Sequence, residues 1–476
     1  MRVQSMHFKA RAGEKLADQR LQANLKKLTT KFVSGRANAI LDLADFEGTR
    51  DAAATMRQRA IDHLDVWLEM FEREAVKRGA HVLYAETSAQ AAQLVVEIGR
   101  RHGVKKAIKT KSMVSEEMAL NRALEDAGIT PIETDLGEYI LQMNDNEAPS
   151  HIVAPVVHKD KEEIAALFAR IHQRPPKAEI SALTREAREM LRPHFVSAEM
   201  GITGGNFLIA ETGSVALVTN EGNEGMCTLL PPKVHVVVTG IEKVLPSLSD
   251  LATVMRLLPR SAVGQTISNY VSLLTGPKQE GDSEGPQHMY FVLVDAGRTD
   301  LVGSDMEEML RCIRCGACMN HCPVYQKIGG HSYGWVYPGP MGSVLTPSYV
   351  GLEASLDLPQ ASTLCGECHV VCPVKIALPD LLRKLRERQV TAGLRPRSER
   401  LALAAWGFLA KRPKLYRLFA RVAAKLLHWM GGQGGQIRHL PLASGWSDFR
   451  DMAAPVGETF QDWYAKQAKQ ADLADQ

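Results

Sequence analysis

The sequence predicts an α/β domain that continues into a cysteine-rich segment and then into a basic helical region. Short apolar runs alternate with amphipathic stretches between about residue 80 and residue 295. Strands and helices that alternate in this way predict a mainly parallel, doubly wound sheet. Seven of the eight cysteines follow, between Cys312 and Pro373, and lysine and arginine accumulate from Leu378 onward. These three observations predict four segments, at residues 1–75, 76–300, 301–390 and 391–476.

The first segment is expected to be helical, because residues 51–60 and 64–71 carry apolar side chains at three- and four-residue steps. The expected strands of the α/β domain are 81–85, 106–109, 131–134, 151–155, 214–219, 233–239 and 289–295. The expected helices are 88–101, capped by Ser88, then 112–127, ending before Gly128, then 161–172 and 180–193. The polar, glycine-rich loop 276–287 is expected at the surface.

The first cysteine run has the spacing C-x2-C-x2-C-x3-C-P, from Cys312 to Pro323. Bacterial ferredoxin modules hold cubane iron–sulfur clusters with this spacing. Three cysteines of a run bind one cluster, and the fourth, redirected by the proline, binds the other cluster. The first cluster is therefore predicted to be held by Cys312, Cys315, Cys318 and, from the second run, Cys372.

The second cysteine run is one ligand short. It supplies Cys365 and Cys368, which we predict to bind a second cluster together with Cys322. Ser362 stands where a complete run has its first cysteine. The fourth ligand is then Ser362, a water, another side chain or none, and the cluster is either [4Fe–4S] or [3Fe–4S]. Structural zinc is the alternative for all seven cysteines, but zinc sites favour paired C-x2-C units with four ligands per ion.

Composition limits the location of the protein. The 476 residues are 45% hydrophobic and 23% charged, as in soluble globular proteins. The sequence has no visible export signal and no apolar stretch of about 18 residues, so neither secretion nor a membrane-spanning helix is expected. Few cysteines lie outside the two runs, which favours a reducing cytoplasm. Cys227 is expected to be a small buried side chain.

The net charge of +3 is unevenly distributed. Residues 378–428 contain 13 lysines and arginines against three acidic residues, on expected helices at 378–389, 401–410 and 416–430. These helices either pack on the cluster segment with a solvated basic face, or form a docking face for a membrane or an acidic partner. The expected location is therefore cytoplasmic, with a peripheral position at the inner face of the membrane as the second option. The charge asymmetry does not by itself indicate nucleic-acid binding.

Three stretches of the α/β domain are candidate ligand sites. Residues 134–139 place two carboxylates and a tyrosine at a strand end, where open α/β sheets bind ligands. Residues 201–214 are glycine-dense and contain Glu211, the weak candidate for a catalytic residue, and residues 219–225 follow the next strand. Tight turns at a sheet edge explain the glycines equally well. Dinucleotide and P-loop motifs are absent from the sequence.

Together these residues resemble the lactate-utilisation protein B (LutB) family. The resemblance rests on residues 134–139 (TDLGEY), 201–214 (GITGGNFLIAETGS), 240–244 (GIEKV), 329–342 (GGHSYGWVYPGPMG) and 372–376 (CPVKI). It implies a LUD domain, with a fold similar to the NagB/RpiA/CoA-transferase proteins, then a ferredoxin-like module with two clusters and a basic C-terminal region. It includes members with serine at the position of Ser362.

The resemblance also implies one subunit of a three-protein bacterial system that oxidises L-lactate to pyruvate. Its companions are a cysteine-rich A subunit and a C subunit that is a LUD domain alone. The leading hypothesis is an electron-transfer subunit that passes electrons through two clusters to an acceptor such as quinone, with Arg311, Arg314 and Lys375 favouring the reduced clusters. Two alternatives are a LUD domain that itself acts on a small carboxylate at the Glu211 loop, and clusters with a purely structural role.

Overall fold

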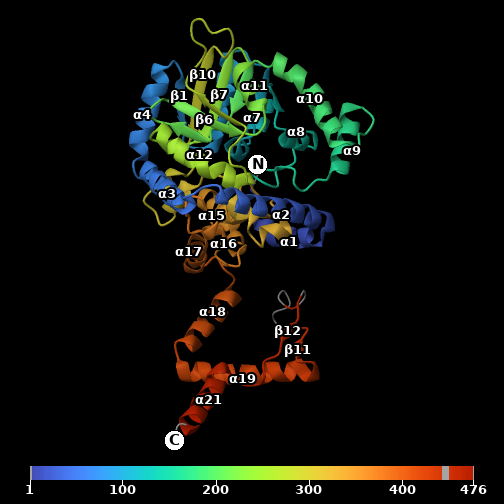
Figure 1. The fold of residues 1–476 in the computed structure, drawn as a ribbon, viewed down its shortest axis with the longest axis vertical. Helices are drawn as coiled ribbons and strands as arrows, with labels where there is room; N and C mark the ends of the chain where they lie inside the picture. Colours follow the sequence, from blue (N-terminus) through green and yellow to red (C-terminus); the bar gives the residue numbers. More distant parts are fainter. Residues whose placement is uncertain (1–2, 442–446, 448–449, 475–476) are drawn as a thin grey trace. The chain divides into compact units, whose positions relative to one another are not determined.

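The computed structural model describes residues 3–441, 447 and 450–474. The chain divides into two compact units, Met1–Thr391 and Ala392–Gln476, and each is described by itself. The first unit contains the N-terminal helices, both larger sheets and every cysteine (Figure 1).

The core of the first unit is a six-stranded sheet in which all five neighbouring pairs are parallel. This confirms the predicted parallel, doubly wound architecture. In spatial order the strands are β1 (His81–Ala85), β10 (His288–Val294), β7 (Val234–Gly240), β4 (Met200–Thr203), β2 (Lys106–Lys109) and β3 (Thr130–Glu133).

Alternating side chains of the central strand β7 serve the two faces of this sheet. Val234, Val236 and Val238 are fully buried in a core with the helices of one face, whereas Val237 is buried in the core of the other face. A strand with both faces covered is apolar throughout, as expected for a parallel sheet. The helices of the first face are α5 (Ser88–Arg101), α6 (Met113–Glu117) and α7 (Leu120–Asp126), and α4 (Leu64–Lys77) packs on the second face.

A second, four-stranded sheet covers part of the other face. Its spatial order is β8 (Val244–Leu245), β5 (Phe207–Ile209), β6 (Ser214–Thr219) and β9 (Tyr270–Leu274). Five more helices complete the α/β region: α8 (Leu136–Met143), α9 (Lys161–His172), α10 (Ile180–Ser197), α11 (Asn223–Leu229) and α12 (Leu248–Val263). The apolar side chains of α8, α9 and α10 form a separate core beside the strand β2.

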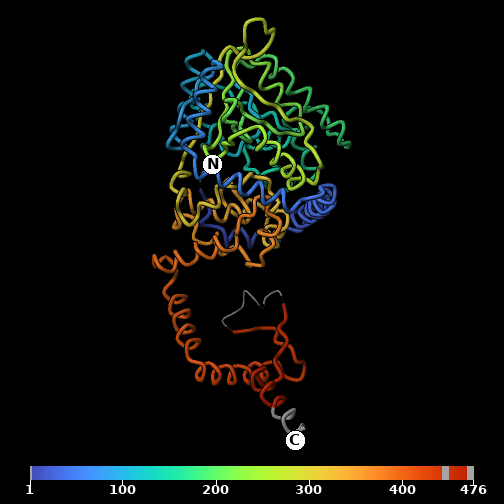
Figure 2. Tube along the Cα trace, turned by 60° about the vertical axis from the view of Figure 1, so that its left-hand side comes forward, coloured from blue at the N-terminus to red at the C-terminus, as the bar shows by residue number. Residues whose placement is uncertain are grey.

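The N-terminal helices join the α/β region to the cysteine segment. They are α1 (Phe8–Ala17), α2 (Gln19–Leu41) and α3 (Phe46–Asp62). Asp18 and Asp45 cap α2 and α3 by accepting backbone N–H bonds. Helix α2 packs against α12 on one side and against α13 and α14 of the cysteine segment on the other (Figures 1 and 2). One continuous hydrophobic core therefore extends from α2 and α12 to the cysteines.

The cysteine segment consists of short helices and turns. Its α-helices are α13 (Ala317–Asn320), α14 (Tyr325–Ile328), α15 (Gly339–Val350), α16 (Glu367–Val370) and α17 (Leu378–Thr391). Along the whole described chain, short 3₁₀ helices lie at Ser5–His7, Ile241–Lys243, Thr299–Leu301, Glu307–Arg311, His331–Tyr333, Glu353–Ser355, Leu358–Gln360 and Gly432–Gly434.

The predicted strand at 151–155 is wrong. This stretch is an irregular turn closed by the imidazole of His151, whose Nδ1 accepts the N–H groups of Val153 and Ala154 at 3.0 Å each. The Nε2 of His151 pairs with the Asn320 side chain at 3.0 Å. A ring that accepts two backbone N–H groups replaces the sheet ladder that the apolar residues suggested.

Three further expectations need correction. The predicted helix 112–127 is two helices, because Ala119 between them has a left-handed backbone with φ of 51°. Thr87, not Ser88, caps α5. The strand β4 (Met200–Thr203) overlaps the glycine-dense stretch 201–214, for which no strand was predicted. A Cβ at its Gly201 would lie 1.8 Å from the carbonyl oxygen of Cys227, so this glycine lets α11 pack directly on the sheet.

The second unit contains α18 (Arg397–Ala410), α19 (Pro413–Gly431), the two-stranded β11 (Gln436–Ile437) and β12 (Met452–Ala453), and α21 (Phe460–Ala474). The helices predicted at 401–410 and 416–430 are confirmed. Large apolar side chains on α18 and α19 are exposed, among them Trp406, Phe419 and Trp429. Among the described residues, no helix is both long enough and apolar enough to cross a membrane.

Candidate metal centre

The two cysteine runs have the same local backbone. In the first run Arg314 and Gly316, on either side of Cys315, have left-handed φ values of 58° and 79°. In the second run Leu364 and Gly366, on either side of Cys365, have values of 55° and 89°. A single helical turn follows each pair, α13 or α16, and carries the next cysteine. This backbone turns the N–H groups and side chains of each run toward one side.

The same comparison shows that Ser362 has the position in the second run that Cys312 has in the first run. The Arg314 N–H donates to Cys312 Sγ at 3.4 Å, and the Leu364 N–H donates to Ser362 Oγ at 3.1 Å. In both runs the donor is therefore the backbone two residues further on. The hydroxyl of Ser362 has the place in its run that the thiol of Cys312 has in the other.

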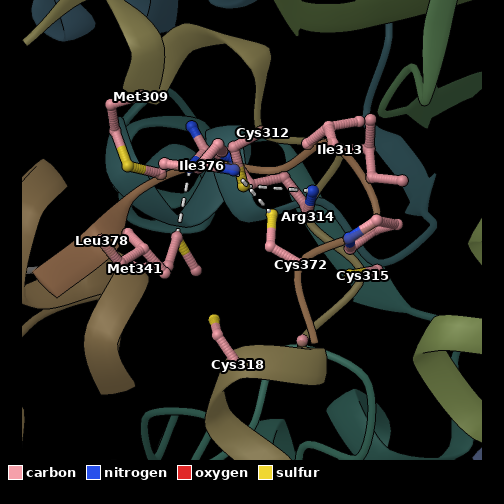
Figure 3. Close-up of a pocket in the computed structure, with 13 residues that line it drawn as sticks. Met309, Cys312, Ile313, Arg314, Cys315, Cys318, Met341, Cys372, Ile376 and Leu378 are labelled. Carbon is pink, nitrogen blue, oxygen red and sulfur yellow. Dashed lines mark hydrogen bonds between the residues drawn. The ribbon is translucent and has the colours of Figure 1, made fainter. Parts of the chain in front are cut away.

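Four of the cysteines line a single cavity of about 370 Å³ (Figure 3). They are Cys312, Cys315, Cys318 and Cys372, the set predicted to share one cluster. In Figure 3 the sulfur of Cys318 faces those of Cys372 and Cys312 across the opening. The remaining wall is mainly apolar, formed by Met309, Ile313, Met341, Val374, Ile376 and Leu378.

Burial controls the protonation of these thiols. It raises the pKa of Cys315 to about 12 and that of Cys372 to about 11, and the neighbouring thiols add to the effect. Burial and the surrounding thiols raise the pKa of Cys318 well above its ordinary value. Thiolates crowded in an apolar cavity require a cation to offset their charge, which is what a bound metal or cluster provides. The donor set and its surroundings therefore fit an iron–sulfur cluster.

The other three cysteines form a second group. Burial raises the pKa of Cys322 and raises that of Cys368 to about 12, and Cys365 is close enough to both to raise them further. Cys322 and Cys368 are buried, whereas Cys365 is exposed. Cys365 is thus the one exposed cysteine among the seven of the two runs.

Two arginines from the N-terminal helices hold the second cysteine run. The guanidinium of Arg50, on α3, donates to the carbonyl oxygen of Cys372 at 2.7 Å and to that of Val370 at 2.8 Å. Arg36, on α2, donates to the carbonyl oxygen of Val371 at 3.2 Å. Both side chains are buried, so these charge-assisted bonds fix the backbone that carries Cys372.

Arg57 holds the first run to the α/β region. This fully buried side chain donates to the carbonyl oxygens of Leu310 and Val244 at 2.9 Å each, and to that of Glu242. Lys243 adds a bond from its Nζ to the carbonyl oxygen of Cys312 at 3.1 Å. The start of the first run is therefore fixed by Arg57 from α3 and by Lys243 from the segment after β7; burial, together with the charge of Arg314, lowers the pKa of Lys243 to about 7.

A buried ion-pair network continues this connection. Arg298 pairs with Glu242 at 2.8 Å and with Glu117 at 3.0 Å. The hydroxyl of Tyr337 donates to Glu117 at 2.8 Å, and Arg314 lies 3.5 Å from Glu242. Burial alone would raise the pKa of Glu242, but Arg298, Lys243 and Arg314 lower it to about 2. The carboxylate is therefore ionised and ties the sheet to the cysteine loop.

A second cavity of about 1010 Å³ lies between the sheet and the first cysteine run; we call it the interface pocket. One wall carries polar side chains that follow the carboxyl ends of strands, including Lys111, Asn206, Glu221 and Glu224. Arg314 and Cys315 belong to the other wall. Open α/β sheets bind ligands at this edge. Burial raises the pKa of Glu221 and of Glu224 to about 7.

The three candidate ligand sites predicted in the α/β domain lie in different places relative to these cavities. Residues 219–225 border the interface pocket. Asp135 also lines this pocket and caps α8 by accepting the N–H of Gly137, whereas Tyr139 is buried with its hydroxyl against His172. Glu211 lies exposed and accepts the N–H of Leu248 at 2.6 Å at the start of α12, apart from the residues that line these cavities. Cys227 is fully buried.

The sequence analysis missed the buried cations Arg57, Lys109 and Arg298 and the half-buried Lys111. The sequence did contain a sign of Lys109 and Lys111, because both lysines lie inside or just beyond a short apolar strand. A lysine buried there needs acidic partners to offset the cost of burying its charge. No comparable signal marks Arg57 or Arg298, whose partners lie far away in the sequence.

Three family models together match most of the chain. Residues 68–294 match the LUD domain, residues 308–376 match a 4Fe-4S dicluster domain, and residues 383–469 match the C-terminal region of lactate utilisation protein B. Fold and site thus define an iron–sulfur protein in which a parallel α/β LUD domain precedes a dicluster region.

Full-length relatives identify the family. Lactate utilization protein B of Shouchella clausii is 41% identical over 470 residues, covering 99% of each chain. The protein of that name from Bacillus velezensis is 40% identical, also over 99% of each chain. A protein of Escherichia coli K12 described as an uncharacterized electron transport protein, YkgF, is 38% identical over 99% of this chain and 98% of its own. This chain belongs to the lactate utilization protein B family, which confirms the predicted resemblance.

Proposed function

We propose that this protein is the iron–sulfur electron-transfer subunit of a system that oxidises L-lactate to pyruvate. The observation that carries the proposal is the cavity in which four cysteines from two separate runs meet. The match to a dicluster domain and the names of the relatives, lactate utilization protein B and electron transport protein, support it. Bound clusters would supply one-electron redox chemistry.

Within this proposal, Cys312, Cys315, Cys318 and Cys372 bind the first cluster. Cys322, Cys365 and Cys368 bind the second, with Ser362 as the fourth ligand. The equivalent backbone positions of Ser362 and Cys312 support the choice of serine over a water. Since Cys322 and Cys372 each leave one run for the other cluster, the two clusters are held close together.

The chain's own residues prepare this path for electrons. Arg36, Arg50 and Arg57 are buried cations bonded to the backbone of the runs, and Lys243 bonds to Cys312. Fixed positive charge beside a cluster favours its reduced, more negative state. The apolar side chains of the cavity exclude water from the first cluster, which also tunes its potential.

Partners and acceptor follow from the same proposal. Electrons would arrive from the cysteine-rich A-type subunit or the C-type LUD subunit and leave to a quinone.

We propose that the second unit brings the protein to the inner face of the membrane, because α18 and α19 combine exposed aromatic side chains with lysine and arginine. Flotation with anionic vesicles tests this; a protein that stays unbound at low salt contradicts it.

Iron analysis and EPR spectroscopy of the anaerobically purified protein test the central proposal. About eight irons per chain are expected, or about seven if the second cluster is [3Fe–4S]. Reduction should produce cluster signals, and in the reconstituted complex L-lactate should produce them too. Iron near zero with stoichiometric zinc would refute the proposal. Clusters that never change redox state with lactate in the full complex would instead favour a structural role.

A second candidate is catalysis by the LUD domain itself on a small carboxylate. The interface pocket favours it over the Glu211 loop, because Lys111 on one wall faces a pocket whose other wall contains Cys315. This candidate predicts that the protein alone, with clusters in place, reduces a dye when given L-lactate, and that Lys111→Met abolishes the activity. If turnover requires the other subunits, the result supports the electron-transfer role and not catalysis by the LUD domain.

A further inference from the structure

A third cavity, of about 1300 Å³, lies at the edge of the main sheet beside the strand β3. It shares no lining residue with the cysteine cavity or the interface pocket. Three glutamates from three elements line it: Glu116 from α6, Glu133 from β3 and Glu138 from α8. The ligand oxygens of the three side chains lie within 4.8 Å of one another. We call this group the glutamate cluster.

Lys109 contacts two members of the glutamate cluster directly. It is fully buried, and its Nζ lies 2.8 Å from Glu133 and 3.3 Å from Glu116. Three ionised carboxylates and this ammonium would sum to a formal charge of −2, and Lys111 is close enough to Glu138 to offset part of it. Such a charge is costly in a buried site unless a proton or a further cation balances it.

Three oxygen acceptors at the cavity have no hydrogen-bond donor among the described residues. They are Glu133 Oε2, Glu138 Oε1 and Asn121 Oδ1. Glu133 and Glu138 are only 2% and 4% exposed, so bulk water does not solvate them fully. The Asn121 amide nitrogen donates to Glu133 at 2.7 Å, which leaves its oxygen as the atom without a donor. An unpaired buried acceptor costs about 1–3 kcal/mol, so each of the three atoms needs a water, a proton or a bound cation as its partner.

The kind of partner follows from the donor atoms. All the available atoms are oxygens, from carboxylates and one amide, which hard divalent cations prefer over soft metals. An entry route exists, because Arg122, Glu125 and Asp126 on the cavity rim are exposed.

We propose that the glutamate cluster binds a divalent cation such as Mg²⁺ or Mn²⁺. Glu116, Glu133 and Glu138 supply carboxylate oxygens, Asn121 supplies its amide oxygen, and Lys109 positions Glu133 and Glu116. This site is separate from the iron–sulfur clusters and does not depend on the electron-transfer proposal. The rival is a proton, since burial and the neighbouring carboxylates raise the pKa of Glu138 well above its ordinary value.

Calorimetric titration of the cluster-containing protein with Mn²⁺, after dialysis against metal-free buffer, tests the proposal. One saturable site is expected in the wild type. Glu133→Gln and Glu138→Gln should each weaken binding by about tenfold or more, since each replaces a charged ligand. Glu125→Gln is the matched control, because it removes the same charge from the exposed rim of the same cavity, and it should change binding less than about twofold.

A second measurement separates cation binding from folding. Without metal, Glu138→Gln should unfold at the same or a higher temperature than the wild type, because it removes a buried ionisable group. Mg²⁺ should raise the unfolding temperature of the wild type and of Glu125→Gln but not that of Glu138→Gln. The proposal is overturned if the wild type shows no saturable Mn²⁺ site at millimolar concentrations, or if binding survives both cavity substitutions. Iron content and cluster EPR signals report separately on the proposed function.

Discussion

Ser362 Oγ and Cys312 Sγ accept the same backbone hydrogen bond in their respective runs, from the N–H two residues further on, at 3.1 Å and 3.4 Å. Ser362 therefore has the same local position in its run as Cys312 has in the other, and the two runs differ here in the side-chain atom, a hydroxyl oxygen or a thiol sulfur, rather than in the backbone. If a cluster binds there, one of its irons meets an oxygen or an open position. This corner is where the two clusters should differ most in stability and potential.

The first prediction concerns this corner. Ser362→Cys should complete four-thiolate ligation, so the second cluster becomes more resistant to air and any [3Fe–4S] signal in the EPR spectrum disappears. Ser362→Ala should remove the ligand and convert the cluster more readily to [3Fe–4S]. Thr363→Ala, at the exposed neighbouring position, is the control. An EPR spectrum of Ser362→Ala identical to that of the wild type would show that the hydroxyl is not a ligand.

Single cysteine substitutions should separate the two clusters. Cys318→Ala removes one of the four thiols that line the four-cysteine cavity. It should lower the iron content by about four irons per chain, with the second cluster retained. Cys365→Ala should remove or alter the second cluster only. Cys227→Ala, buried outside both runs, should leave the iron content unchanged. Loss of both clusters in Cys365→Ala but not in Cys318→Ala would contradict the assignment.

Arg50→Met should destabilise the first unit by about 2–4 kcal/mol and lower its iron content. The substitution leaves the carbonyl oxygens of Cys372 and Val370 without their charged donor, and such buried bonds are expensive to lose. Arg59→Met on the same helix is the control: its ion pair with Asp250 is half exposed and should contribute about 0–1 kcal/mol. Denaturant unfolding and iron analysis measure both effects. Equal losses in the two variants would show that the carbonyl contacts do not matter.

Glu224→Gln should stabilise the protein in a pH-dependent way. Burial raises the pKa of Glu224 from its ordinary value of 4.5 to about 7, so between these pH values the folded state holds a proton that the unfolded state releases. Stability conferred by the protonated carboxyl is therefore lost as pH rises from about 4.5 to 7. The gain in unfolding free energy from Glu224→Gln should be about 2 kcal/mol larger near about pH 8 than near about pH 5.5.

The control for this prediction is Glu280→Gln, an exposed position in the 276–287 loop, which should show no such difference. A gain that is equal at both pH values would mean that Glu224 keeps an ordinary pKa. Because Glu224 lines the interface pocket, a small carboxylate ligand that binds there should also reveal itself as a change in this pH dependence.

Local patterns in the sequence predicted the parts of the protein that local physics determines. The spacing from Cys312 to Cys322 anticipated the four-cysteine cavity together with Cys372, and the short apolar runs anticipated β1, β2, β6, β7 and β10. The strand β4 was not predicted, because its glycine-dense sequence is more typical of a turn than of a strand. Gly201 is in fact needed there for the close approach of α11.

Long-range electrostatics could not be predicted in this way. Glu117 and Arg298 are 181 residues apart and become partners only when the sheet forms. His151 looked like part of an apolar strand, yet its ring closes a turn and pairs with Asn320, which is 169 residues away. The glutamate cluster was only partly visible: Glu138 stood out within residues 134–139, but Glu116 and Glu133 come from two other elements.

The bond from Arg50 to the carbonyl of Cys372 has a consequence for biogenesis. The two residues are 322 positions apart, so the helix made near the start of synthesis waits for almost the whole first unit before it meets its partner. Cys372 is also the proposed last ligand of the first cluster. If Cys372 binds the first cluster as proposed, a ribosome-bound or truncated chain would carry an incomplete ligand set, and insertion of that cluster would have to follow completion of the first unit. The N-terminal helices would then contribute to maturation through Arg50, which fixes the backbone of the last ligand.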